Sequence, residues 1–287
     1  MILITGASGN LGTAVIEHLL QQVPAHTIAG LCRNKNKAEP LAVTGISVRM
    51  GDYADKASLV KVFEGVEKLL LISSSNNDAI QEHKNVVDAA KECGVSSIYY
   101  TSGALNKSVN QSKLGPLADS YMNTENYIFE TGITYTIFQN GLYAETIPAF
   151  IGEQVLETGI YFPAGNGKSS FAKRAEMGEA IANVLAGEGH ENKIYVTTVQ
   201  DTHSFSDIAI ILSELSGKKI AYHSPNAAEY ELHLRAMSME EMDIWYCSTL
   251  AAIIKNSEYE VSSPDLEKLL GRTPTGLRTY LKETFLS

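Results

Sequence analysis

Tyr121 and Glu125 lie four residues apart in the segment SYMNTENYIFE, residues 120–130, which is expected to form a helix. Residues at this spacing share one helix face, so the two side chains can act on the same group. A lysine four residues after a tyrosine would lower the pKa of the phenol and help it to donate a proton. A carboxylate does the opposite, because neighbouring groups that both become anions repel. The pair therefore argues against an activated tyrosine, and it leaves Tyr121 either to pack or to line a substrate mouth with Glu125.

Three glycines offer a second kind of chemistry near the N-terminus, in TGASGNLG at residues 5–12. Gly6 permits a tight turn, Gly9 lets the backbone approach a pyrophosphate, and Gly12 allows a helix to pack closely on a sheet. The loop lies between an apolar segment and an amphipathic one, as it does in nucleotide-binding βαβ units. A purely structural turn is the alternative. The pattern favours a dinucleotide site.

Arg33 is the residue that would choose between NAD and NADP, because it directly follows the second apolar segment. An NAD site carries an acidic residue there to hold the ribose 2′-hydroxyl. An arginine fork suits the 2′-phosphate of NADP, and a solvated surface arginine is the alternative.

Asp52 follows the third apolar segment and is placed to contact an adenine. The fourth apolar segment is followed by three serines, Ser73, Ser74 and Ser75, which we expect beside the nicotinamide-side ribose. For Asp52 and for the serines alike, a plain turn is the alternative.

A regular alternation of strands and helices positions these residues. Strands are expected at Ile2–Thr5, Thr27–Cys32, Ser47–Met50, Lys68–Ser73, Ser97–Thr101 and Thr134–Gln139, and helices at Leu11–Gln22, Asn34–Thr44, Ala57–Glu64, Asp78–Cys93 and Ala118–Thr131. Strands alternating with helices at this pace form a parallel sheet covered on both faces by right-handed crossovers. The expected fold is α/β, a doubly wound parallel-sheet Rossmann domain.

The alternation loosens after residue 140. Arg174–Ala186 is expected to be a helix and Lys193–Val199 a strand that rejoins the sheet, whereas residues 204–285 are mainly helical. We therefore expect an NADP-binding Rossmann core at residues 1–140, completed by 170–200. A smaller, mainly helical C-terminal substrate lobe is expected from 141–169 and 201–287. Such a lobe would cap the carboxyl ends of the strands, where ligands bind in these folds.

Composition narrows the function classes. The chain has 287 residues and a formal net charge of −10, which argues against general binding to nucleic acid or to an anionic membrane. Cysteines 32, 93 and 247 are odd in number and far apart, as in a reducing compartment. The N-terminus does not resemble a signal peptide, and no apolar run reaches the ~20 residues of a membrane span. The seven histidines lack metal-ligand spacing. We expect a cytoplasmic protein without a metal site.

Several segments together resemble the NmrA-like branch of the atypical short-chain dehydrogenase/reductases. They are TGASGNLG at the N-terminus, LCRN after the second strand, GDY at 51–53, EKLLLISSS at 67–75 and YTIFQNGLYAE at 135–145. GHENKIYVTT and SELSGKKIAYH extend the resemblance over nearly the whole chain, and the likeness is greatest to bacterial members that reduce quinones or triarylmethane dyes. Gln139 departs from the pattern, because relatives tend to have arginine there.

The resemblance implies NADP(H) as cofactor and direct hydride transfer to a flat aromatic acceptor such as a quinone. We expect the cofactor to be bound by the residues that the resemblance implies and by the candidates at the strand ends. They are Gly6, Ala7, Ser8, Gly9, Asn10, Leu11, Arg33, Asp52, Ser73, Ser74, Ser75, Asn140, Gly141, Leu142, Tyr143 and Arg174. Tyr143 and Tyr121 are the candidate catalytic residues. Tyr143 follows the sixth strand and is placed to wall the acceptor site or to donate a hydrogen bond, with packing of the lobe as the alternative.

A quinone acceptor agrees with the glutamate at position 125. Its reduction yields an aromatic hydroquinone with delocalised charge, so little acid assistance is needed, and the protein has mainly to stack the acceptor and exclude water. The rival hypothesis is a regulatory NmrA-like protein that senses NADP(H) without turnover. A sugar-nucleotide epimerase would need the missing Tyr-x-x-x-Lys pair. The natural acceptor, the proton donor and the oligomeric state stay open, and an oligomer is compatible with the sequence.

Overall fold

Seven parallel strands form the central sheet, in the order β11-β6-β5-β4-β1-β2-β3. Their bounds are β1 Ile2–Ile4, β2 Ile28–Cys32, β3 Ser47–Met50, β4 Lys68–Ile72, β5 Ser97–Gly103, β6 Thr134–Asn140 and β11 Lys193–Thr197. The computed structural model describes residues 1–74, 76, 78–106, 112–113 and 115–286. The strand order reverses between β1 and β4, which is the switch point at which such sheets bind ligands. The predicted doubly wound Rossmann sheet is confirmed.

The strands at the centre of the sheet are apolar on both faces. Leu3 of β1 lies between Leu69 of β4 and Ala29 of β2, and all three side chains are fully buried. Such runs are typical of strands in parallel sheets that helices cover on both sides. The carboxyl ends of β1 to β4 therefore meet at one edge.

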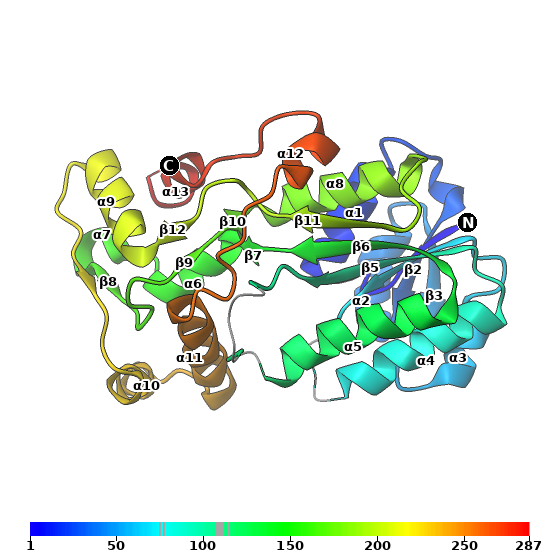
Figure 1. Ribbon diagram of the computed structural model, residues 1–287, viewed down its shortest axis with the longest axis horizontal. Helices are drawn as coiled ribbons and strands as arrows, with labels where there is room; N and C mark the ends of the chain where they lie inside the picture. The colour runs from blue at the N-terminus through cyan, green and yellow to red at the C-terminus, as the bar shows by residue number, and fades with distance from the viewer. Residues whose placement is uncertain (75, 77, 107–111, 114, 287) are drawn as a thin grey trace.

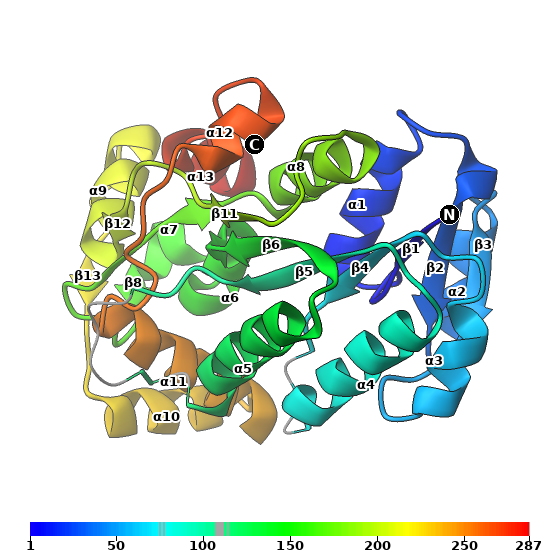
Figure 2. The ribbon, with the colours of Figure 1, turned by 45° about the vertical axis from the view of Figure 1, so that its right-hand side comes forward.

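Helices cover both faces of the sheet, as Figures 1 and 2 show. One face carries α1 (Asn10–Leu19), α2 (Lys35–Ala42), α8 (Arg174–Ala186) and α12 (Asp265–Leu270), and the other carries α3 (Lys56–Val62), α4 (Ala79–Glu92) and α5 (Pro116–Thr131). Each face has its own hydrophobic cluster. The amphipathic periodicity of the helices produces this arrangement, since each buries one apolar stripe against the strands.

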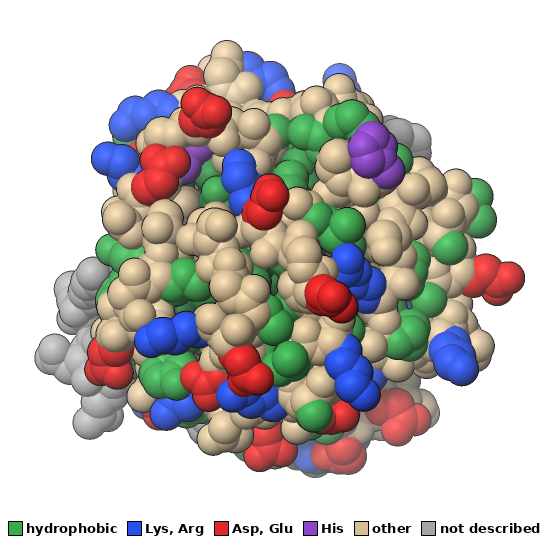
Figure 3. Space-filling view, turned by 90° about the vertical axis from the view of Figure 1, so that its right-hand side faces the viewer, with side chains coloured by type: hydrophobic (Ala, Val, Ile, Leu, Met, Phe, Trp, Pro, Cys, Tyr) green, Lys and Arg blue, Asp and Glu red, His purple; other side chains and the backbone are tan. Residues whose placement is uncertain are grey.

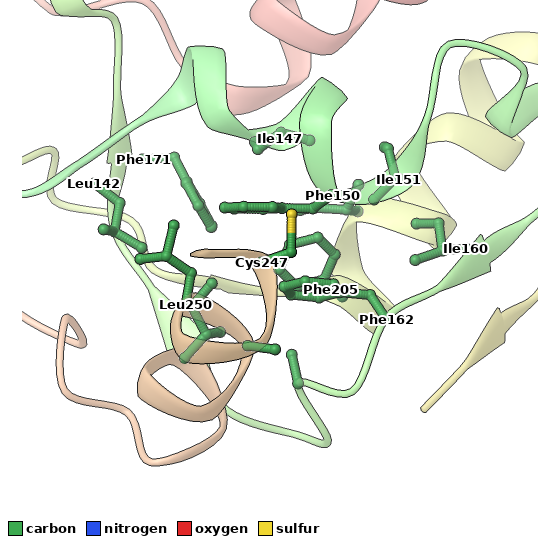
Figure 4. Close-up of a cluster of buried hydrophobic side chains, with 14 of the residues drawn as sticks. Leu142, Ile147, Phe150, Ile151, Ile160, Phe162, Phe171, Phe205, Cys247 and Leu250 are labelled. Carbon is green, nitrogen blue, oxygen red and sulfur yellow. The ribbon is translucent and has the colours of Figure 1, made fainter. Parts of the chain in front are cut away.

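A third hydrophobic cluster lies beyond the carboxyl end of β6 (Figure 1). The part of the chain that contains this cluster comprises η2 (Ala144–Thr146), α6 (Ile147–Ile151), α7 (Val155–Thr158), α9 (Phe205–Ser216), α10 (Ala227–Ala236), α11 (Glu241–Lys255) and α13 (Leu277–Phe285), with the two-residue strands β7 (Leu142–Tyr143), β8 (Ile160–Tyr161), β9 (Lys168–Ser169), β10 (Phe171–Ala172), β12 (His203–Ser204) and β13 (Tyr222–His223). Figure 4 shows its centre, where Phe150 and Phe162 stack with ring centroids 4.9 Å apart and Phe205 packs on Phe162. We call this unit the lobe.

The chain returns from the lobe to the sheet twice. β11 pairs with β6 in parallel, from Lys193 opposite Thr136 to Thr197 opposite Asn140. α12 packs against α8 through Leu266 and Leu270, although it lies within the range expected for the substrate lobe. The short 3-10 helix η1 (Ala25–Thr27) precedes β2.

One face of the protein, the one on the right-hand side of Figure 1, is mixed in charge. On the face in Figure 3, acidic and basic side chains are intermingled, and hydrophobic side chains lie among them. Within the described part of the chain, none of the helices has the length and apolar character that crossing a membrane requires.

Candidate functional site

A cleft of about 520 Å³ opens at the carboxyl ends of β1 to β4. The residues that line it come from the glycine loop, from the ends of β2, β3 and β4, and from α2 and α4. They are Gly6, Ser8, Gly9, Leu31, Arg33, Asn34, Lys37, Gly51, Asp52, Tyr53, Ile72, Ser73, Ser74, Asn76 and Glu82. The cleft therefore unites residues from four separate βα connections.

The glycine loop forms the tight turn between β1 and α1. Gly6 has a φ of +57°, a left-handed conformation that favours glycine, and its carbonyl accepts the N–H of Gly9 at 2.9 Å. A Cβ on Gly12 would lie 2.3 Å from the carbonyl oxygen of Gly6, so only glycine lets α1 start this close to the loop. No side chain caps the N-terminus of α1 at Gly9. The first N–H groups of this helix are thus suited to an anion such as a pyrophosphate.

A basic corner lies at the end of β2. Arg33 and Lys37 both line the cleft and are both exposed, and Asn34 caps α2 by accepting the N–H of Asn36 at 2.8 Å. This cap fixes the start of the helix that carries Lys37. Two cations beside one cleft wall suit a phosphate group better than a neutral hydroxyl. The sequence analysis did not single out Lys37, which the first turn of α2 places beside the cleft.

The loops after β3 and β4 close the cleft from the other side. Asp52 lines it, and one of its carboxylate oxygens accepts the N–H of Ala54 at 3.0 Å. The hydroxyl of Tyr53 hydrogen-bonds to the hydroxyl of Thr5 and to the carbonyl of Ile72, so this ring braces β1 against β4. The wall beside β3 is thereby rigidly supported.

Ser73 and Ser74 line the cleft where β4 ends. The Ser73 N–H donates to Oγ1 of Thr101 on β5 at 3.0 Å, and the Ser74 hydroxyl donates to Glu82 at 3.0 Å. The predicted site residue Ser75 lies outside the described residues. Glu82 was not anticipated, although a carboxylate in the first turn of the helix after β4 is a signal that could have indicated it.

Four tyrosines gather where β5 and β6 meet the lobe. Tyr121 of α5 is hydrogen-bonded to the side chains of Ser73 and Tyr259, and Tyr143 and Tyr246 are its electrostatic neighbours. Burial is the main cause that raises the pKa of each of these phenols. We call this group the tyrosine cluster. Ser73 touches both the cleft and the cluster, so the two parts form one continuous site.

Gly103 makes the room in which two of these rings meet. A Cβ at this position, the last residue of β5, would lie 2.7 Å from Cε2 of Tyr121 and 3.0 Å from the hydroxyl of Tyr259. Tyr259 is 5% exposed and comes from the turn after α11. Sequence reasoning missed it, because nothing in its neighbourhood indicates that it reaches β5.

Glu125 does not act on the phenol of Tyr121. Its carboxylate accepts two hydrogen bonds from Nε2 of Gln139 on β6, at 3.0 and 3.2 Å. Both residues are half-buried. A neutral amide therefore satisfies the acid, and the position offers Tyr121 no cation.

Tyr143 and Arg174 are stacked. The guanidinium carbon of Arg174 lies 4.4 Å from the centroid of the Tyr143 ring, within the range of a cation–π contact. The backbone N–H of Arg174 donates to both carboxylate oxygens of Glu145, at 3.0 and 3.1 Å, which anchors the first turn of α8. Arg174 lowers the pKa of Tyr143, but burial outweighs it and leaves that pKa raised. The stacked pair forms one wall of the tyrosine cluster.

The remaining predicted residues lie around the site rather than in the cleft. Ala7 and Leu11 are buried in the cluster beneath α1, and Asn10 is exposed at the start of that helix. Asn140 accepts a hydrogen bond from Thr197 and hydrogen-bonds to Tyr143, so it positions that ring. Gly141 and Leu142 are buried at the junction of β6 with the lobe.

The geometry fits a dinucleotide with an extra phosphate. The cleft combines the uncapped N-terminus of α1 for a pyrophosphate with Arg33 and Lys37 for a further phosphate, and it runs through Ser73 to the tyrosine cluster. In the described part of the chain, no three His, Cys, Asp or Glu side chains are grouped so that they could hold a metal ion.

Known proteins resemble this chain over its full length. The NmrA-like family matches residues 1–273. Quinone oxidoreductase 2 of Escherichia coli strain K12 is 38% identical, and the match covers 99% of each chain. The crystal structure of Citrobacter sp. triphenylmethane reductase complexed with NADP(H) has a TM-score of 0.90 at 38% identity, covering 99% of this chain and 100% of that one. The Escherichia coli NADPH-dependent quinone oxidoreductase complexed with NADPH gives 0.89 at 37% identity with the same coverage.

Proposed function

The chain belongs to the NmrA-like family, and from this membership we propose that it is an NADPH-dependent oxidoreductase whose acceptor is a quinone or a similar flat aromatic electrophile. Two relatives that are 37 and 38% identical are named for NADPH-dependent quinone reduction and for triphenylmethane reduction. The fit of the cleft to a phosphorylated dinucleotide supports the same cofactor. NADPH, when bound, supplies the hydride.

We assign the cofactor to the cleft. The N-terminus of α1 and the backbone of Gly6 to Leu11 would hold the pyrophosphate, and Arg33 with Lys37 the 2′-phosphate. Asp52 would contact the adenosine half, and Ser73 and Ser74 the nicotinamide-side ribose. Asn140 and Arg174 act at the far end by fixing the ring of Tyr143.

The tyrosine cluster would form the acceptor site. The rings of Tyr121, Tyr143 and Tyr246 provide flat apolar surface against which an aromatic acceptor can stack. Because burial raises the pKa of Tyr121 and of Tyr143, both phenols stay protonated and can donate hydrogen bonds to an acceptor oxygen. Their task is to orient the acceptor and to stabilise developing negative charge, while solvent protonates the product.

The observation that carries this proposal is the partner of Glu125. Its hydrogen bonds to Gln139 leave Tyr121 without the neighbouring cation that a ketone reductase uses to make the phenol acidic. A quinone needs no such acid, because its reduction product delocalises the charge over an aromatic ring. The chemistry of the acceptor and the chemistry of the site therefore agree.

The direct test is NADPH oxidation by the purified protein with benzoquinones, naphthoquinones and triarylmethane dyes, with a simple ketone as the matched control. We expect turnover with at least one flat acceptor and none with the ketone. Absence of oxidation above background across the whole panel would overturn the proposal. The assay also distinguishes the proposed oxidoreductase from the rival hypothesis, since a sensing protein would bind NADPH without consuming it.

We further propose the division of labour expected from the chain order. Residues 1–140 with 170–200 would hold the cofactor, and 141–169 with 201–287 would complete the acceptor site. Tyr143, Tyr246 and Tyr259 all belong to the latter ranges, which supports this division. The three free cysteines among the described residues support a reducing compartment such as the cytoplasm.

A further inference from the structure

A buried histidine lies directly behind the cofactor cleft. His83, on α4, has no exposed surface, and its Nε2 accepts the backbone N–H of Ser74 at 2.9 Å. Its Nδ1 lies 2.9 Å from Oγ1 of Thr124 on α5. One imidazole thus connects the loop after β4 to two helices.

The hydrogen bonds determine the state of the ring. A backbone N–H can only donate, so Nε2 must be the unprotonated nitrogen. The neutral ring then carries its proton on Nδ1 and donates it to Thr124. Burial lowers the pKa of His83 to about 4, which agrees with a neutral imidazole.

The neighbours of His83 do not replace it as the acceptor of the Ser74 N–H. The rings of Tyr53 and Tyr100 stand edge-on to the imidazole, with centroids 6.4 and 5.7 Å away. The adjacent Glu82 binds the Ser74 hydroxyl and the amide of Asn76, not the ring. Glu82 therefore holds the side chains of Ser74 and Asn76, and His83 holds the backbone at Ser74.

We propose that His83 is a positioning residue for the cofactor, which turns the Ser74 N–H inward and thereby sets how Ser73 and Ser74 face the dinucleotide. Without an acceptor at Nε2, a buried N–H would be left unpaired, and the loop would have to rotate to recover a partner. Such a rotation would move the cleft wall and the hydroxyl of Ser73, which reaches Tyr121. The inference rests on the proposed NADPH site but not on the identity of the acceptor.

Two substitutions of His83 test the contacts of its two ring nitrogens separately. In His83→Gln the side-chain amide reaches about as far as Nε2, so its oxygen can accept from Ser74. In His83→Asn the amide reaches only the position of Nδ1, so the contact with Thr124 is kept and that with Ser74 is lost. Thr124→Val removes the other contact and serves as a matched control.

The readout is the Kd for NADPH, measured by nucleotide fluorescence without any acceptor, together with the thermal unfolding midpoint of each free protein. We expect His83→Asn to weaken NADPH binding by about 10-fold or more, and His83→Gln and Thr124→Val to stay within about threefold of wild type. Equal NADPH affinity in all variants would overturn the proposal. Losses of affinity that simply follow the loss of thermal stability would also overturn it, because they would indicate packing alone.

A second measurement does not depend on the folding of any variant. Amide hydrogen exchange of wild-type protein without cofactor is expected to show a protected Ser74 N–H, because its acceptor is internal. Exchange at the rate of a free amide would contradict the role of His83. Neither measurement involves turnover, so a failure of the acceptor panel would leave this inference intact.

Discussion

Glu125 and Gln139 are hydrogen-bonded across the interface of α5 and β6, with the two carboxylate oxygens 3.0 and 3.2 Å from the same amide nitrogen. At each of these two positions the chain differs from the residue that a related enzyme would carry. Glu125 replaces the lysine of an activated tyrosine site, and Gln139 replaces the arginine that the family resemblance implies. Each departure provides the partner of the other, so the acid is part of the scaffold around the tyrosine cluster.

Replacing the acid should therefore cost stability and not catalysis. Glu125→Ala removes a half-buried hydrogen-bond acceptor, and we expect the free energy of unfolding to fall by about 1 kcal/mol. With a naphthoquinone, kcat should stay within about threefold of wild type. Urea denaturation and steady-state kinetics measure the two quantities, with Glu130→Ala on the exposed side of α5 as control. A loss of kcat on the order of 100-fold with unchanged stability would instead assign Glu125 a catalytic role.

Arg33 should discriminate between the two nicotinamide cofactors. Arg33→Ala removes one charge-assisted contact to the 2′-phosphate, and we expect NADPH binding to weaken by roughly 10- to 100-fold while NADH binding barely changes. Fluorescence titration of both cofactors provides the measurement. Lys35→Ala is the matched control, because Lys35 begins the same helix but does not line the cleft. Equal weakening for both cofactors would refute the assignment to the 2′-phosphate.

Tyr121 should act as a neutral hydrogen-bond donor. Because burial raises its pKa, the phenol stays protonated even above pH ~10, the ordinary value for tyrosine, and kcat should be level from about pH 7 to pH 9.5. Tyr121→Phe should lower kcat by about 10-fold without shifting this profile. Tyr230→Phe, which alters a buried phenol of α10 outside the tyrosine cluster, is the control. An alkaline break that the Tyr121→Phe variant abolishes would instead indicate proton transfer from this phenol.

His83 should make stability depend on pH in a defined window. Burial lowers its pKa from an ordinary 6.5 to about 4 in the folded protein, so the unfolded chain binds the extra proton first. Its contribution is complete above pH 6.5, is lost as the pH falls from 6.5 to about 4, and amounts to roughly 3 kcal/mol.

The measurement is the free energy of unfolding of wild type and of His83→Gln between pH 7 and pH 4.5. Carboxylates titrate in both proteins, so the difference between the two curves isolates the histidine. We expect wild type to lose more stability than the variant as the pH falls. Parallel curves would show that His83 titrates alike in the folded and unfolded states.

Some features of the protein were predictable because they are local. The glycine loop needs only consecutive residues to form its turn, and Arg33 directly follows a strand, so the proposed site of a phosphorylated dinucleotide could be predicted from single segments. The alternation of apolar runs and amphipathic helices likewise indicated the parallel sheet. The interpretation that Tyr121 is not an activated acid also follows from its spacing to Glu125 alone.

Other features exist only because the fold brings distant residues to one edge of the sheet. Tyr259 reaches Tyr121 from the turn after α11, through the space that Gly103 provides at the end of β5. His83 looked like any helical histidine until its two nitrogens were placed between Ser74 and Thr124.

One physical cause separates the features that were predictable from the sequence from those that only the folded protein shows. Backbone conformation and the alternation of strands with helices depend on short-range sequence patterns, so the sequence by itself indicated the Rossmann sheet and the glycine loop, whereas the order of the strands came from the structure. Hydrogen bonds between side chains depend on directions and distances between elements that pack only in the folded protein. Tertiary structure alone therefore decided that Glu125 pairs with Gln139, and that neutral phenols surround the proposed acceptor site.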